Sequence, residues 1–426
     1  RKNNGAKRDM HYEMEQEEHD VYPDDPDFDI NKARLVTTAP RICVRYECVP
    51  MRFIKHVYRI HTYAQDGRLF EGKTPVSAFL NSSYDGSFIA GLMELRYIQS
   101  LPVERIINYF ESHGFTLKKP TAHKLMEKAS SLFENLYKCI RQTALSDPYK
   151  AADETYYKIL VPEKNSKGKG VRKGYLWVVV GINTRMIYLL YDDGSRSEKV
   201  ILNELGGCKG IIQSDGYSPY RKLESDAYPH ITRIPCLQHI KRKFIDCGED
   251  EPDAKRIVEL INTLYQNEHK HKIGVDGWTV EQNLVHRKKY APDILGEIKD
   301  VLDDIEERGD LLPKSELKEA VTYLRNEWNA VVDIFNYGDT YLDNNIVERM
   351  NRYISLSRKN SLFFGSHKGA ERGAILYTIA LTCRMNKVNL FEYLTDVINR
   401  TAEWQPNTPL EKYRQLLPDR WEKAND

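Results

Sequence analysis

The chain lacks the long apolar runs of a membrane protein. Its longest apolar run, Tyr175 to Ile182, is far too short to cross a bilayer. The polar N-terminus also lacks the apolar segment of a secretory signal peptide. We therefore expect no membrane partner and a cytoplasmic location. The first residue is Arg1 rather than Met, as expected if a leader segment is missing from the sequence.

Cysteine is also sparse and scattered. The seven cysteines are Cys43, Cys48, Cys139, Cys208, Cys236, Cys247 and Cys383. An odd and dispersed set is typical of a reducing compartment, so we expect no disulfide framework. Cys43 and Cys48 are followed by His56 and His61, but the span between them resembles a strand and is too short for a usual zinc finger. No zinc is expected there.

The chain has almost no excess of charge of either sign, because 63 Lys and Arg and 62 Asp and Glu give a net charge of +1. The balance hides an asymmetry, since residues 1–30 hold four Lys and Arg against ten Asp and Glu. This segment is typical of a flexible acidic tail, and the body of the chain is mildly basic. With 41% hydrophobic and 29% charged residues, 426 residues predict a soluble globular protein of two or three domains.

Strand-like composition is concentrated in residues 151–244. Three sequential strand patterns, AADETYYKILVP, YLWVVVGI and MIYLLYD, are followed by a predicted helix at 197–205. The strand GIIQSDG, a short helix at 219–223 and the strand ITRIPC complete the segment. This order is that of an RNase H-like α/β core, in which the first and fourth strands are neighbours. Residues 248–337 then form an amphipathic, all-helical insertion.

Three acids stand out in this arrangement. Asp153 and Asp215 lie at or beside strand-like runs, and Glu348 lies near the start of a predicted helix. A carboxylate in such a place costs folding energy unless something binds it, and hard divalent cations are the usual partners. We predict that the three acids bind two Mg²⁺ (or Mn²⁺) ions for phosphoryl transfer. The alternative is that each Asp caps a turn, since DGY is a common turn sequence.

A helical segment precedes the core. Two apolar stripes, separated by SHGFTLKKPT, predict a helix pair with basic residues at the start of its second helix. These residues are Lys118, Lys119, His123 and Lys124. The pattern resembles a DNA-binding helix-turn-helix, and an αα-hairpin packed on the core is the equal alternative.

Basic residues also cluster around the predicted site, where cations are needed to hold phosphates near repelling carboxylates. The candidate DNA contacts are His239, Lys241, Arg242, Lys243, Arg349, Arg352, Arg358, Lys359 and Asn360, with Lys368 and Arg372 nearby. Arg352 can instead pair with Glu348 one turn away on the same helix. Tyr353, Phe363 and Phe364 can stack on bases, although core packing is the commoner role. Cys236 and His239 supply only two metal ligands, so we expect no zinc and interpret His239 as a neighbour of the active site or of phosphate.

Several of these segments resemble one known family. DETYY, QSDGY, CLQHIKRKF and DNNIVERMNRYISLSRKNSLFFGSHKGAERGAILYTI are similar to segments of insertion-sequence-66 family bacterial transposases, and the resemblance extends from about residue 46 to the C-terminus. It implies an RNase H-like Asp-Asp-Glu transposase that uses Mg²⁺ or Mn²⁺ to cut transposon ends and join them to target DNA. It further implies a triad of Asp153, Asp215 and Glu348, a homodimer or larger assembly on DNA, and small accessory proteins. The Cys-x4-Cys spacing and the missing aromatic residue in CLQHIKRKF depart from the family pattern.

The expected organisation follows from these patterns. The expected segments are an acidic flexible lead-in (1–40), a β-hairpin segment with degenerate zinc-finger-like character (41–75), a helical, candidate DNA-binding domain (76–147), the first part of the RNase H-like core (148–247), the all-α insertion (248–337), the C-terminal helices of the core (338–405) and a tail (406–426). Two other functions stay open. One is a metal-dependent nuclease of the same fold without strand transfer, and the other is an inactive or domesticated DNA-binding protein.

Overall fold

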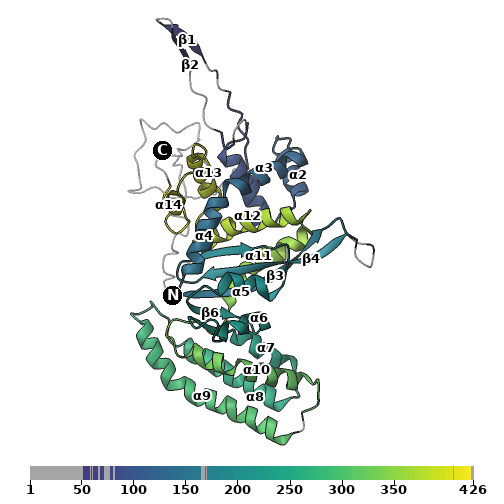
Figure 1. Ribbon diagram of the computed structural model, residues 1–426, viewed down its shortest axis with the longest axis vertical. Coiled ribbons are helices and arrows are strands. Elements are labelled where there is room, and N and C mark those ends of the chain that lie inside the picture. The colour runs from purple at the N-terminus through teal and green to yellow at the C-terminus, as the bar shows by residue number, and fades with distance from the viewer. Residues whose placement is uncertain are drawn as a thin grey trace, which may run out of the picture. The chain divides into compact units, whose positions relative to one another are not determined.

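The computed structural model describes residues 51–57, 59, 61–65, 68–71, 77–79, 82–164, 168, 170–309, 311–405 and 407–423. The chain divides into two compact units, Arg1–Arg52 and Phe53–Asp426. The expected lead-in and the pair Cys43 and Cys48 lie outside the described residues. All helices and strands of the described residues lie in the second unit (Figure 1).

A five-stranded mixed sheet forms the centre of this unit (Figure 1). The strands are β3 (Tyr149–Leu160), β4 (Val171–Gly181), β5 (Met186–Leu190), β6 (Gly210–Ser214) and β7 (Ile231–Pro235). Their order is β5-β4-β3-β6-β7. The first three strands pair antiparallel, whereas β3, β6 and β7 run parallel. The predicted neighbour relation between the first and fourth strands is confirmed, and the sheet is compatible with an RNase H-like core.

Helices cover the sheet and protect its edge. The helices that follow the insertion are α11 (Asn345–Asn360), α12 (His367–Met385), α13 (Leu390–Thr401) and α14 (Leu410–Arg414). Helix α11 packs on β3 and β4, and α12 packs on β5. On α12, Thr378 Oγ1 accepts the Leu189 N–H at 2.9 Å, and Thr382 Oγ1 donates to the Ile187 carbonyl at 2.8 Å. These bonds satisfy backbone groups that the edge strand β5 would otherwise leave unpaired.

The other face of the sheet carries shorter elements. They are α5 (Glu198–Leu205), α6 (Ser218–Arg221) and a 3₁₀ turn (Lys222–Glu224). Successive strand residues point to opposite faces. Asp153 is bonded to a side chain of α11, whereas its neighbour Glu154 lies near Tyr220 of α6. Asp153 therefore belongs to the α11 face.

The segment before the sheet is helical, as predicted. Its elements are α1 (Gly86–Met93), a π-helical turn η1 (Glu94–Ile98), α2 (Val103–Ser112), α3 (Lys119–Leu132) and α4 (Glu134–Ser146). Gly114, with φ of 82°, ends α2, and a proline stands in the first turn of α3. Helix α3 buries one face against α1 and α12, while Lys118, Lys119 and Lys124 stay exposed. The helix pair therefore packs on the core and also presents its cations to solvent.

A hairpin lies within residues 41–75, the expected hairpin segment. A two-stranded antiparallel sheet joins β1 (Thr62–Gln65) and β2 (Arg68–Glu71), whereas residues 51–57 form no strand. The register leaves only the dipeptide DG between the strands, which is favoured in two-residue hairpin turns.

The chain between β7 and α11 carries only helices among its described residues. Helix α7 (Leu237–Asp246) leads into α8 (Pro252–Glu268), α9 (Val280–Arg308) and α10 (Glu316–Ile334). Their apolar faces form one core with residues of β3, β6 and β7, so the insertion is packed on the sheet (Figure 1). At the C-terminus, the expected tail is also packed, since Tyr393 donates to the Leu416 carbonyl at 2.8 Å. In the described part of the chain, no helix combines the length and apolarity that a membrane span needs.

Candidate active site

Asp153 lies inside β3, at the level where its parallel neighbour β6 ends. The parallel register pairs Tyr149 with Ile211 and Ala151 with Gln213. Continued by two residues, this register places Asp153 opposite Asp215, the first residue after β6. Two residues that are far apart in sequence therefore lie on neighbouring strands, at the level where β6 ends and β3 continues.

The Asp153 carboxylate sits in a half-buried and electronegative place. Its Oδ2 accepts a hydrogen bond from Asn351 Nδ2 at 2.7 Å, and its Oδ1 accepts the Glu154 N–H at 2.8 Å. Burial, followed by the charges of Glu154 and Asp215, raises the pKa of Asp153 to about 7. A group with this environment is suited to bind a cation, because a cation would stabilise the charged form that burial disfavours.

The loop that carries Asp215 is held by the insertion. The Asp215 Oδ1 accepts the Tyr217 N–H at 3.0 Å, and the Gly216 N–H donates to Tyr323 Oη of α10 at 2.8 Å. A Cβ at Gly216 would lie 2.5 Å from that Tyr323 oxygen, so this close approach requires glycine. Arg233 of β7 donates to the Asp215 carbonyl at 3.2 Å. The backbone on both sides of the Asp215 side chain is therefore fixed.

Arg233 anchors the same loop to α10 through a buried ion pair. The side chains of Arg233 and Glu327 are both 0% exposed and are hydrogen-bonded to each other. Arg233 also pairs with Glu224, and Arg221 lies 3.9 Å from Glu327. Burial opposes the charge of Arg233, but the two carboxylates more than offset this and raise its pKa. The sheet and the insertion are thus joined by charge as well as by apolar packing.

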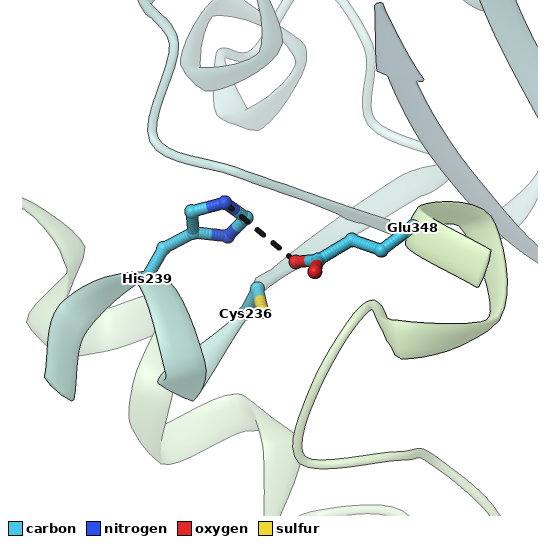
Figure 2. Close-up of side chains that lie close together, drawn as sticks. All are labelled: Cys236, His239 and Glu348. Carbon is cyan, nitrogen blue, oxygen red and sulfur yellow. Dashed lines mark ion pairs between the residues drawn. The ribbon is translucent and has the colours of Figure 1, made fainter. Parts of the chain in front are cut away.

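Glu348 lies in the first turn of α11, on the helix that carries Asn351 three residues later. Its Oε1 is 3.8 Å from His239 Nε2 of α7, and Cys236 is the third member of this group (Figure 2). The ligand atoms of these three side chains all lie within 4.8 Å of one another, and no other group of three His, Cys, Asp or Glu side chains among the described residues is as close. Asp153, Asp215 and Glu348 do not form so tight a set.

Some of the expected cations lie beside Asp215. A hollow of about 340 Å³ is lined by Asp215, His239, Arg242 and Lys243. Arg196, which sequence reasoning missed, lines it too and pairs with Glu154. These positive groups surround an opening next to one of the acids, and Lys241 lies half-buried on the same helix α7.

Other expected cations face elsewhere. Arg349 and Arg352 line a separate hollow of about 830 Å³ with Arg384 and Lys387. Glu348 is paired with His239 and not with Arg352 in the part of the chain that the structure describes. The alternative of an Arg352 ion pair on the same helix is therefore not realised.

The end of α11 has a structural role. Arg358 donates to the Tyr156 carbonyl at 2.6 Å and lies 4.0 Å over the Tyr156 ring. Asn360 donates to the Ser100 carbonyl at 3.2 Å, whereas Lys359 is exposed. Arg358 and Asn360 thus tie α11 to β3 and to the helical segment.

The candidate stacking residues have different surroundings. Phe364 is buried and its ring lies 4.3 Å from that of Tyr157, which agrees with core packing. Phe363 is 47% exposed. Tyr353 lies under the guanidinium of Arg384, at 4.7 Å.

Comparison with known proteins identifies the family of this chain. The family model described as "Transposase IS66 family" matches residues 81–372. The chain belongs to this family. It is 25% identical to the uncharacterized protein y4jD of Sinorhizobium fredii over 78% of this chain, and it spans 65% of that relative's length. It is 24% identical to y4hP of the same organism, over 93% of this chain and 76% of that protein.

The family match includes the segments that carry all three acids. It also includes residues that sequence reasoning did not single out, namely Asn351, Tyr323, Arg233 and Arg196. Asn351 has a detectable signal, because it stands three residues after Glu348 and so lies on the same helix face. The other three have none, since their roles depend on which helix of the insertion meets which loop.

Proposed function

We propose that this chain is a DNA transposase that cleaves transposon ends and joins them to target DNA. Asp153, Asp215 and Glu348 would hold two Mg²⁺ or Mn²⁺ ions. The observation that supports the proposal is the parallel register of β3 and β6, which continues to Asp153 opposite Asp215. Helix α11, which carries Glu348 in its first turn, packs on β3. The oxygen-only donor set and the raised pKa of Asp153 suit a hard divalent cation.

The metal ions would activate the attacking oxygen and stabilise the leaving oxygen of a phosphodiester. The protein's own residues hold and orient the acids. Asn351 fixes one oxygen of Asp153, and Tyr323 fixes the loop of Asp215. The cations Arg242 and Lys243 border Asp215 and would bind the phosphates of DNA that the acids repel.

The partners follow from the reaction. Two transposon ends must be brought together, so we propose a homodimer or larger assembly on DNA, with small accessory proteins of the element as further partners. Lys118, Lys119 and Lys124 on the exposed side of α3 are proposed to contact DNA as well. The protein would act in the cytoplasm on chromosomal DNA.

The first test removes one carboxylate charge at a time. Asp153→Asn, Asp215→Asn and Glu348→Gln should each abolish Mg²⁺-dependent cleavage of end DNA while leaving DNA binding nearly intact. Asp226→Asn is the matched control, because Asp226 is an exposed acid outside the hollow. Wild-type cleavage by any of the three variants would remove that residue from the proposed triad.

The same assay separates the other candidate functions. Cleavage without joining of pre-cut ends would indicate a nuclease. DNA binding without metal-dependent cleavage would indicate an inactive or domesticated binding protein.

A second test concerns the cations of α7. The double change Lys241→Ala and Arg242→Ala should weaken DNA binding and lower the slope of log affinity against log salt by about 2. Lys299→Ala with Lys318→Ala is the control, because both lysines are exposed on the insertion. An unchanged salt slope in the first pair would place Lys241 and Arg242 away from the DNA.

A further inference from the structure

Cys236, His239 and Glu348 converge from the starts of two helices. Cys236 is the N-cap of α7 and His239 lies in its first turn, while Glu348 lies in the first turn of α11. Their sulfur, nitrogen and oxygen ligand atoms all lie within 4.8 Å of one another (Figure 2). The sequence alone shows only two candidate metal ligands, Cys236 and His239. The fold supplies the third from more than a hundred residues further along the chain.

The ligand atoms of this group are not fully used by the protein. Among the described residues, Glu348 Oε1 and the second ring nitrogen of His239, Nδ1, are buried without a hydrogen-bond partner, and the distance of 3.8 Å between His239 Nε2 and Glu348 Oε1 is too long for a hydrogen bond. A buried polar atom without a partner costs free energy. The Cys236 Sγ accepts the Asn344 N–H at 3.2 Å, an interaction that orients the sulfur.

The spacing suits a small metal ion. Bonds of about 2.0–2.3 Å in a tetrahedral site separate the ligand atoms by roughly 3.3–3.8 Å. The His239 to Glu348 distance already has this size. His239 and Glu348 are both half-buried whereas Cys236 is buried, so an ion or a water molecule would reach the group from the side of His239 and Glu348.

The donor types select the class of ion. A sulfur, an imidazole nitrogen and a carboxylate oxygen form a set that borderline ions such as Zn²⁺ or Co²⁺ prefer, whereas Mg²⁺ prefers oxygen alone. Three protein ligands leave the fourth position for water.

We propose that Cys236, His239 and Glu348 bind one ion of the Zn²⁺ class, and that this ion competes with the magnesium site for Glu348. Binding of the ion is independent of the proposed function, whereas the competition for Glu348 rests on the proposed function. When the ion is bound, Glu348 is directed toward α7 and is withheld from Asp153 and Asp215. Zn²⁺ would therefore inhibit the Mg²⁺-dependent reaction.

The binding is tested with Co²⁺ on the full chain after removal of metals by chelation. Titration should give a thiolate-to-cobalt charge-transfer absorption at one equivalent. Cys236→Ser should remove this absorption, and Glu348→Gln should weaken Co²⁺ binding by more than about 100-fold, since even partners outside the ligand set are worth 10–100-fold. Cys247→Ser is the control, because Cys247 ends the same helix outside the group. Asp153→Asn should also keep the absorption.

The outcomes are distinct. Absence of the charge-transfer absorption, or its persistence in Cys236→Ser when circular dichroism shows a folded protein, would overturn the site. Zn²⁺ should inhibit Mg²⁺-dependent cleavage by the wild type and do so less in Cys236→Ser, and equal inhibition of both would overturn the competition. A chain that binds Co²⁺ as described but cuts no DNA would retain the site and lose only the proposed function.

Discussion

Replacing Arg233 by methionine should destabilise the protein strongly, and the loss should depend on pH. The change leaves the Glu327 carboxylate 0% exposed, with Arg221 at 3.9 Å as its nearest cation. Burial already raises the pKa of Glu327, and Arg233 is the main group that opposes this rise. Breaking a buried ion pair by removing one partner typically costs about 3–5 kcal/mol.

Protonation of Glu327 limits the free-energy cost of losing Arg233, and it determines how this cost changes with pH. A carboxyl group with an unfolded pKa near 4.3 can be protonated at pH 7 for about 3.7 kcal/mol, and at pH 5 for about 1 kcal/mol. A carboxyl whose folded pKa is raised destabilises the fold above its unfolded pKa, so stability is lost as pH rises. The Arg233→Met deficit should therefore shrink by up to about 2.7 kcal/mol between pH 7 and pH 5.

The assay is urea unfolding of the wild type and the variant at both pH values, followed by tryptophan fluorescence. Trp328, one of the five tryptophans of the chain, follows Glu327 on α10. The double change Arg233→Met with Glu327→Leu should recover most of the loss, because no buried charge is left without a partner. A deficit below about 1 kcal/mol at pH 7, or one that is equal at both pH values, would refute the reasoning.

Two further predictions concern Asp153 and the loop that carries Asp215. Asp153→Asn should stabilise the metal-free protein at pH 8 by up to about 4 kcal/mol, because the pKa of Asp153 is raised to about 7 when folded and the ionised group is disfavoured. The gain should vanish as pH falls from 7 to 4, and equal melting temperatures at pH 8 in a chelator would contradict it. Tyr323→Phe removes the acceptor of the Gly216 N–H and should cost about 1 kcal/mol of stability and lower the cleavage rate, with DNA affinity unchanged. Tyr337→Phe, which removes a hydroxyl 3.3 Å from a threonine of β7, is its control in the cleavage assay, and equal rates for both variants would show that Tyr323 does not position the loop.

Much of the sheet could be predicted from the sequence, because its strands carry the information locally. The run Tyr175 to Ile182 is apolar at nearly every position, as a strand covered on both faces must be. The pairing of β3 with β6 followed from the element order alone.

The supports of the site could not be predicted, since they join residues that are distant in sequence. Asn351 and Asp153 are 198 residues apart, and Tyr323 and Gly216 are 107 apart. No local pattern marks a tyrosine that will accept a backbone N–H from another element. The cluster around Glu348 was missed for the same reason, because the Cys-x2-His spacing shows two ligands and hides the third.

The insertion both interrupts the core and supports it. The segments on either side of it are held together, since the Leu237 N–H donates to the Leu342 carbonyl at 2.9 Å and the Asn344 N–H donates to Cys236 Sγ. Gln213 of β6, which is 0% exposed, donates to the Tyr341 carbonyl at 2.8 Å. The chain therefore returns to the sheet at a fixed point, and the position of Glu348 does not depend on how many residues the excursion contains.

Asp215 differs from Glu348 in this respect. Its loop depends on Tyr323 and, through Arg233, on Glu327, and both residues belong to α10 inside the insertion. A shorter insertion could keep the helix start of Glu348 in place, but it would leave the Gly216 N–H and the buried Arg233 without their partners. The requirement to hold Asp215 thus gives a physical reason for a helical excursion that packs back onto the sheet instead of projecting freely from it.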